Sequence, residues 1–274
     1  MKSHTPKYAE TKQANVMSEM NPFKSSLSAL ALSATVFFAP ATSATVFPYS
    51  QDFEGMTPLQ GYPPNDLEAD GWRIYGIAYD SNPYTGPANI VYEYGPFDAA
   101  NGDPGSIQGV ATGQGGPQQG DVVLAKYSDY NNIDQLNYYI AASTFQTQII
   151  STSNVGVWKF TYDAKKGNIE ADSSAFAYIL TQDPITGSAT GFVSKDTTNL
   201  PIEWGTYTLD FLITDSMIGN FLTFGFSATA TNYNGSGVFY DNLNLAPIPL
   251  PAAVWLFGSG LLGLVAIARK KKVA

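Results

Sequence analysis

The sequence predicts an all-β protein: a single jelly-roll-type β-sandwich over residues 45–245, preceded by a signal peptide and followed by a transmembrane helix. Hydrophobic residues in the central region recur with a period of two, which is typical of strands buried on one face. An apolar segment lies near each end of the chain, and a cluster of cations follows the second one. A central region of this length can bury a core that needs no disulfides, and the chain has no cysteine.

The N-terminal 44 residues divide into two parts. Residues 1–19 are polar and aperiodic, and we interpret them as an extension or as the result of a misassigned start codon. Residues 20–44 resemble a secretory signal peptide, because Lys24 precedes an apolar stretch that is too short to span a bilayer and that small residues follow. We expect cleavage after Ala44, or else after Ala41. A short buried helix is the alternative, but the segment shows no amphipathic face.

Five strands can be placed from the alternation of apolar and polar residues, at 157–164, 175–180, 206–213, 221–228 and 238–245. In the third of these, Tyr207, Leu209 and Phe211 share one face of the strand. Turn residues separate the strands, at 166–168, 183–184, 186–188 and 234–235. No window of a dozen residues shows the stripe of an amphipathic helix, so we expect the domain to be built from strands.

Residues 101–120 are rich in glycine, proline and glutamine. This composition disfavours a strand and predicts a long surface loop or an insertion. A domain boundary in this segment is the alternative.

The C-terminal region predicts a membrane anchor. Residues 252–268 carry no charge, and a basic tail at 269–274 begins with four consecutive cations: Arg269, Lys270, Lys271 and Lys272. This pattern predicts a transmembrane helix that stops with its basic tail in the cytoplasm. A buried core helix with a charged cap is the alternative. Because the signal peptide starts translocation and the cations stop it, we expect the region between them to cross the membrane.

A proline-rich motif at 246–251 precedes the apolar segment. Its core runs into the segment as Ile248, Pro249, Leu250, Pro251 and Ala252. The motif, the apolar segment and the basic tail together resemble the PEP-CTERM family of sorting signals, in particular the VPLPA variant, with isoleucine in place of valine. The resemblance implies that the inner membrane holds the protein until an exosortase-type transpeptidase cuts near the motif and sends it to the cell surface or the exopolysaccharide matrix. Alternating prolines would keep the motif extended and presented, although a stiff spacer is the alternative.

Composition excludes several classes of site. The chain has no cysteine and only one histidine, His4, which lies in the N-terminal extension. The folded region therefore offers no thiolate zinc site, no cysteine nucleophile and no catalytic triad that contains histidine. Residues 45–245 hold six cations against 21 acids, a net charge of −15, which disfavours a nucleic-acid partner.

A second resemblance points to a calcium site. Residues 52–55, 70–72 and 238–243 resemble the first and last strands of galactose-binding-like jelly rolls, which occur in many carbohydrate-binding modules. This resemblance implies that the first and last strands of the domain are neighbours. In that family the two strands often hold a structural calcium ion between them. The alternation also places Asp241 on the inward face, with Phe239, Leu243 and Leu245, where a carboxylate needs partners. We therefore predict Asp241, with Asp52 and Glu54, as candidate calcium ligands; main-chain amides as its partners are the alternative.

Five tyrosines precede the glycine-rich segment: Tyr75, Tyr79, Tyr84, Tyr92 and Tyr94. They suit a sugar-stacking platform or an ordinary sheet core, and we favour the core. Three functions follow, in decreasing order of preference. The protein is a non-catalytic surface or matrix protein, a glycan-binding module with exopolysaccharide as its partner, or a glycoside hydrolase that uses a pair of acids.

Overall fold

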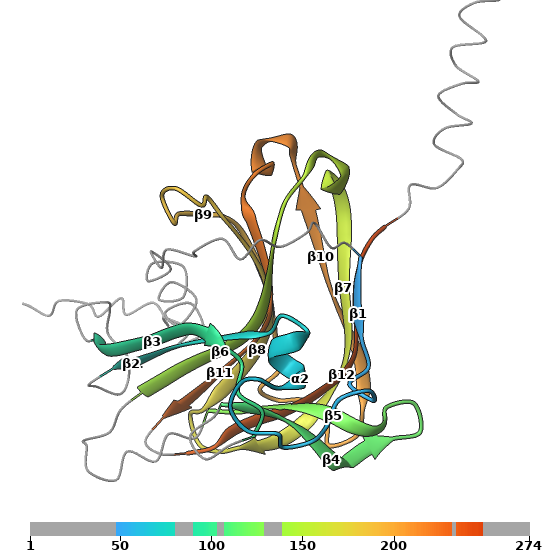
Figure 1. The fold of residues 1–274 in the computed structure, drawn as a ribbon. Helices are drawn as coiled ribbons and strands as arrows, with labels where there is room; N and C mark the ends of the chain where they lie inside the picture. Colours follow the sequence, from blue (N-terminus) through green and yellow to red (C-terminus); the bar gives the residue numbers. More distant parts are fainter. Residues whose placement is uncertain (1–47, 80–89, 103–106, 129–138, 232–233, 249–274) are drawn as a thin grey trace, which may run out of the picture.

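The computed structural model describes residues 48–79, 90–102, 107–128, 139–231 and 234–248, and these form two antiparallel sheets packed face to face (Figure 1). This confirms the predicted all-β sandwich. The signal peptide, the apolar segment at 252–268 and the basic tail lie outside the described residues. Within the described ranges, no helix has the length and apolar character needed to cross a membrane.

The first sheet has the order β10-β7-β12-β5-β4, and β1 pairs with β12. Its strands are β1 (Tyr49–Gln51), β4 (Gln108–Gly116), β5 (Gly120–Lys126), β7 (Gly156–Ile169), β10 (Gly205–Ile213) and β12 (Ser236–Pro247). The pairing of β1 with β12 joins Tyr49 to Leu245, so the first and last strands of the sandwich are neighbours, as predicted.

The second sheet has the order β3-β2-β6-β11-β8-β9. Its strands are β2 (Arg73–Tyr79), β3 (Ile90–Asp98), β6 (Tyr139–Ile149), β8 (Ser174–Gln182), β9 (Ala189–Asp196) and β11 (Phe221–Thr231). The short helices are α2 (Asp66–Ala69), η2 (Thr152–Asn154) and η3 (Asp215–Met217). The five strands predicted from alternation correspond to β7, β8, β10, β11 and β12.

Two local predictions were wrong. Half of the glycine-rich segment is strand where a loop was predicted, because it forms β4 and the first residue of β5, with Val110 opposite Leu124. The register shifts between Thr112 and Gly116, where Gly113 has a φ of 74°, so glycine supplies the backbone freedom that the irregular hairpin needs. The turn predicted at 166–168 instead lies inside β7.

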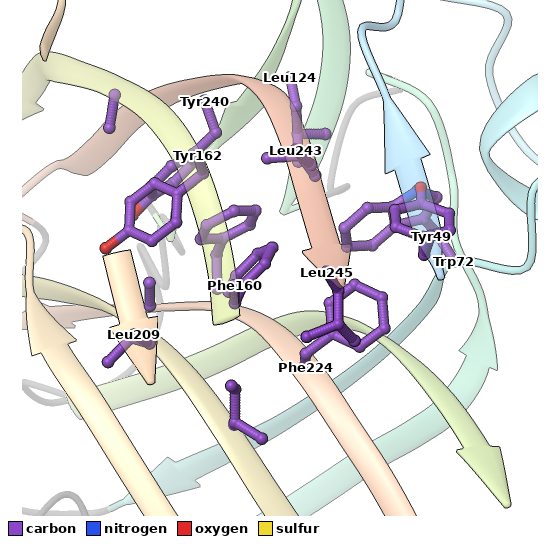
Figure 2. Close-up of a cluster of buried hydrophobic side chains, with 14 of the residues drawn as sticks. Tyr49, Trp72, Leu124, Phe160, Tyr162, Leu209, Phe224, Tyr240, Leu243 and Leu245 are labelled. Atoms are coloured by element: carbon purple, nitrogen blue, oxygen red, sulfur yellow. The ribbon is translucent and has the colours of Figure 1, made fainter. Parts of the chain in front are cut away.

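The core between the sheets is dominated by aromatic rings (Figure 2). Phe226 of β11 and Tyr240 of β12 stack with their centroids 3.6 Å apart, which joins the two sheets directly. The rings of Phe160 and Tyr162 of β7 also pack against Phe226, with centroids 5.9 and 5.6 Å from its own. Aromatic side chains bury large apolar areas, so this cluster provides much of the hydrophobic stabilisation of the sandwich.

Candidate functional site

Asp241 lies at a bulge in β12. The register of β12 against β7 shifts after Asp241, and Asn242 has a left-handed backbone with a φ of 49°. Tyr240 before the bulge and Leu243 and Leu245 after it all belong to the core. Asp241 therefore lies on the opposite side of the sheet from the core, and the predicted inward orientation is wrong because the bulge resets the alternation. The side chain is nevertheless fully buried.

A second buried acid, Asp163 of β7, lies directly opposite Asp241. Three side chains donate hydrogen bonds to it. Gln119 Nε2 and Asn242 Nδ2 donate to Oδ2 at 2.7 and 2.8 Å, and the Thr206 hydroxyl donates to Oδ1 at 2.6 Å. Both oxygens of Asp163 are therefore satisfied without a metal or a cation.

Glu54 and Asp52 lie in the turn that follows β1. Oε1 of Glu54 accepts the backbone N–H groups of Asp121 and Val122, both at 2.8 Å, which ties this turn to the start of β5. Oδ1 of Asp52 accepts the N–H of Glu54 at 3.2 Å. Both acids lie close enough to act electrostatically on Asp241. The structure thus brings the three predicted residues into one neighbourhood and adds a fourth acid.

The carboxyl of Asp241 is poorly compensated. Its pKa is raised to about 7. Burial is the main cause, the N–H of Asn242 opposes it by donating to Oδ1 at 2.7 Å, and the charges of Asp163, Glu54 and Asp52 add to the rise. Oδ2 of Asp241 is buried and has no hydrogen-bond partner. An ionised carboxylate in this position is therefore costly, because half of its acceptor capacity is unused.

The chemistry of this cluster suits a hard cation, since its donors are oxygens and one buried carboxylate oxygen is without a partner. Among the residues that the structure describes, however, no three acid, histidine or cysteine side chains form a group that could hold a metal ion. A calcium ion would need main-chain or water oxygens beside Asp241 and Glu54. Once bound, it would neutralise the buried charge. The calcium site stays a prediction.

Sequence reasoning missed Asp163, although a signal for it exists. Phe160 and Tyr162 in the predicted strand 157–164 face the core, so Asp163 must face the other side. Its position opposite Asp241 depends on the pairing of β7 with β12, which no local pattern reports.

The predicted tyrosine cluster divides between a core and a sheet edge. Tyr75 and Tyr79 are buried in a second hydrophobic cluster on the outer face of the second sheet, as we favoured. Tyr79 and Tyr139 make an edge contact there, with centroids 5.7 Å apart. Tyr92 and Tyr94 are half-buried on the edge strand β3. Tyr84 lies outside the described residues.

The first residues of the sorting motif belong to the sheet. β12 runs to Pro247, and the N–H of Ile248 donates to the carbonyl of Val157 at 2.8 Å. The start of the motif is therefore bound to β7, whereas we expected the motif to be extended and presented. The other predicted residues at this end lie outside the described part of the chain: Pro249, Leu250, Pro251, Ala252, Arg269, Lys270, Lys271 and Lys272.

Comparison with known proteins gives only distant similarities. No protein-family model matches the sequence, and no curated protein matches it. Among solved structures, the chain is similar to TmCBM61 in complex with beta-1,4-galactotriose, with 14% identity, 69% of this chain and 99% of that chain covered, and a TM-score of 0.31. It is also similar to the C-terminal family 22 carbohydrate binding module of Clostridium thermocellum Xyn10B, with 13% identity, coverage of 76% and 97%, and a TM-score of 0.36.

A third similar structure is the enzymatically active domain of tailspike protein 4 from bacteriophage CBA120, with 15% identity and a TM-score of 0.31. The match covers 52% of this chain and 20% of the tailspike chain. These proteins include binding modules and an enzyme, and at such TM-scores neither ligand nor activity transfers to this chain.

Proposed function

We propose that this protein is an exported, non-catalytic β-sandwich that its C-terminal segment anchors in the inner membrane and presents to an exosortase-type transpeptidase. After processing, it acts at the cell surface or in the exopolysaccharide matrix by adhesion or as a structural component. The proposal combines the motif at the C-terminus with the position of the two ends of the sandwich.

One structural observation carries the proposal. β1 and β12 are antiparallel neighbours, with Tyr49 opposite Leu245, so the chain enters and leaves the sandwich at the same end. A signal peptide before residue 45 and a span after residue 251 would then insert into one membrane on the same side of the domain. This arrangement supports the proposal, because both segments can then lie in one membrane while the sandwich projects from it.

The intact mass of the mature protein tests the proposal. We expect a start near Thr45 and an end near Pro251 in the protein recovered from the cell surface. Replacing Pro249 and Pro251 together by alanine should leave the C-terminal segment attached and the protein in the membrane fraction. Pro184→Ala, in the exposed β8–β9 turn, is the matched control and should be processed normally. Recovery of the unprocessed protein dissolved in the cytosol would show that export is wrong.

The absence of catalysis has a separate test. Among the described residues, Asp163 and Asp241 are the two buried acids, and they face each other. Release of reducing sugar from exopolysaccharide, abolished by Asp241→Asn, would contradict the non-catalytic proposal.

A glycan-binding role is the second candidate, and the edge strand β3 favours it. This strand carries Tyr92, Tyr94 and Phe97 at the border of the second sheet, and Phe97 is 58% exposed. Aromatic faces at a sheet edge can stack on sugar rings. Retention on immobilised exopolysaccharide should fall when Tyr92 and Tyr94 are replaced by alanine. Tyr62→Ala, an exposed tyrosine outside the strands, should leave retention unchanged.

A further inference from the structure

Exposed aliphatic side chains gather at the end of the sandwich from which the C-terminal segment leaves. They come from the β6–β7 and β10–β11 connections and from the strand ends beside them, and 37% to 56% of each is exposed. We call this surface the exit face, and its residues are Ile149, Val155, Val157, Leu212, Ile218 and Ile248.

Strand register and one hydrogen bond place Leu212, Val157 and Ile248 side by side on the first sheet. Leu212 lies opposite Val157 across β10 and β7, and the carbonyl of Val157 accepts the N–H of Ile248 at 2.8 Å. On the other sheet, Ile149 lies opposite Phe221. Phe221 is the first residue of β11, and Ile218 precedes it by three residues. Figure 1 shows both connections in the upper part of the view, where β12 also ends.

The connections and strand ends of the exit face carry few charges for a strongly acidic domain, although the exposed ion pair of Lys159 and Asp210 lies beside Val157 and Leu212 on the same side of β7 and β10. Segments 149–157, 211–222 and 244–248 contain a single charged residue, Asp215. Residues 45–245 as a whole have a net charge of −15. A group of exposed aliphatic side chains bordered by one ion pair suits contact with a surface that is apolar inside and polar at its edge.

The length of the connecting chain brings this face close to the membrane. Three residues separate Ile248 from Ala252, where the apolar segment begins. A fully extended chain spans at most about 3.6 Å per residue, so roughly 14 Å joins the last hydrogen-bonded residue of the sheet to the segment. The polar layer on each side of the hydrocarbon core is about 5–7 Å thick. A sandwich tethered this tightly has its exit face at the bilayer surface.

We propose that the exit face docks on the lipid bilayer into which residues 252–268 insert, with Leu212, Val157 and Ile248 in the interfacial layer. The inference rests on the membrane anchoring in the proposed function and adds an orientation to it. Docking moves aliphatic surface out of water, and the anchor keeps the face at the bilayer, so each contact can be weak. The acidic remainder of the domain then points away from the membrane.

The absence of cysteine makes a direct experiment simple. Full-length protein carrying either Leu212→Cys or Ile202→Cys is labelled with an environment-sensitive fluorophore and reconstituted into vesicles of phosphatidylethanolamine and phosphatidylglycerol. Ile202 is the matched control, because it is 74% exposed and lies beside the opposite end of β10. Nitroxide-labelled lipids should quench the label at position 212 at least about twofold more than the label at position 202.

Flotation of the vesicles separates the two claims. If the protein floats and both labels are quenched equally, the docking of the exit face is wrong while the anchoring stands. If the protein does not float with the vesicles, the anchoring fails, and the docking fails with it. Matching thermal melting curves of the two labelled variants establish that both are folded.

Discussion

Asp163 and Asp241 lie directly opposite each other across β7 and β12, and both are buried. No ion pair joins either of them to a lysine or arginine among the described residues. Asp163 accepts hydrogen bonds from three side chains, whereas Asp241 accepts one from the adjacent backbone. The electrostatic cost of the pair is therefore concentrated on Asp241, whose pKa rises to about 7.

This asymmetry predicts that the domain loses stability as the pH rises toward neutrality. The pKa of Asp241 is raised in the folded state, so between about pH 4 and about pH 7 the folded protein binds the proton that the unfolded chain releases. The free energy of unfolding should fall across that window, by at most about 4 kcal/mol. Asp241→Asn should flatten this dependence, as measured by urea unfolding at about pH 5 and about pH 8.

Asp210→Asn is the control for this measurement. Asp210 lies in the same sheet as Asp241, but it is exposed, and its Oδ1 forms an ion pair with Nζ of Lys159 at 3.9 Å. It should leave the pH dependence of the wild type in place. Equal slopes in wild type and Asp241→Asn would show that another group titrates in this window.

Calcium should raise the melting temperature most where Asp241 is ionised. A cation beside Oδ2 would remove the charge penalty, so millimolar calcium should stabilise the wild type at about pH 8 more than at about pH 5. Asp241→Asn should abolish the increase, and Glu54→Gln should reduce it. Titration calorimetry without heat, together with an unchanged melting temperature, would dismiss calcium and leave the raised pKa of Asp241 as a property of the empty cluster.

Close packing against a neighbouring strand makes Gly225 difficult to replace. A Cβ at this position would clash with the carbonyl of Thr144 and would lie 2.7 Å from Cα of Phe145, both on β6. Because backbone must move to admit a methyl group, Gly225→Ala should destabilise the domain by about 1–3 kcal/mol or more. Gly55→Ala is the control, since nothing lies within 4 Å of its Cβ position, and its melting temperature should stay near that of the wild type.

The parts of the fold that the sequence predicted are those in which a strand has one core face and one polar face. β10 is the clearest example, because Leu209 and Phe211 are buried while Thr208 and Asp210 are exposed. β6 gave no such signal, since both of its faces are covered and nearly every residue is buried. β4 was missed because its glycines interrupt the alternation of apolar and polar residues. The positive φ of Gly113 shows that the backbone of this irregular hairpin favours glycine.

The acidic cluster was predictable only in part. Asp52, Glu54 and Asp241 were linked through their positions near the first and last strands, and these strands do pair. Asp163 belongs to the acidic cluster because the register of β7 against β12 places it opposite Asp241. The side of the sheet that Asp241 occupies is set by the left-handed backbone of Asn242. Both are consequences of tertiary structure that one-dimensional alternation cannot report.

Lys126 provides the last prediction, because it is a fully buried lysine in the sandwich. Its Nζ donates to the carbonyls of Ile107 and Tyr127, at 3.1 and 3.2 Å, and burial holds its pKa well below the usual value for lysine. The unfolded chain therefore keeps a proton that the folded protein releases, so this residue makes stability increase with pH up to the ordinary pKa of lysine.

Replacing Lys126 by methionine should accordingly raise the melting temperature at neutral pH and remove this increase with pH. Methionine keeps most of the buried volume and brings no charge into the core, and the Ile107 carbonyl retains a hydrogen bond from the N–H of Tyr127 at 2.9 Å. Thermal melts between about pH 6 and about pH 9 measure both effects. Lys195→Met, at an exposed position of β9, should change neither. A lower melting temperature for Lys126→Met would show that the two hydrogen bonds of Nζ outweigh the cost of burying the lysine.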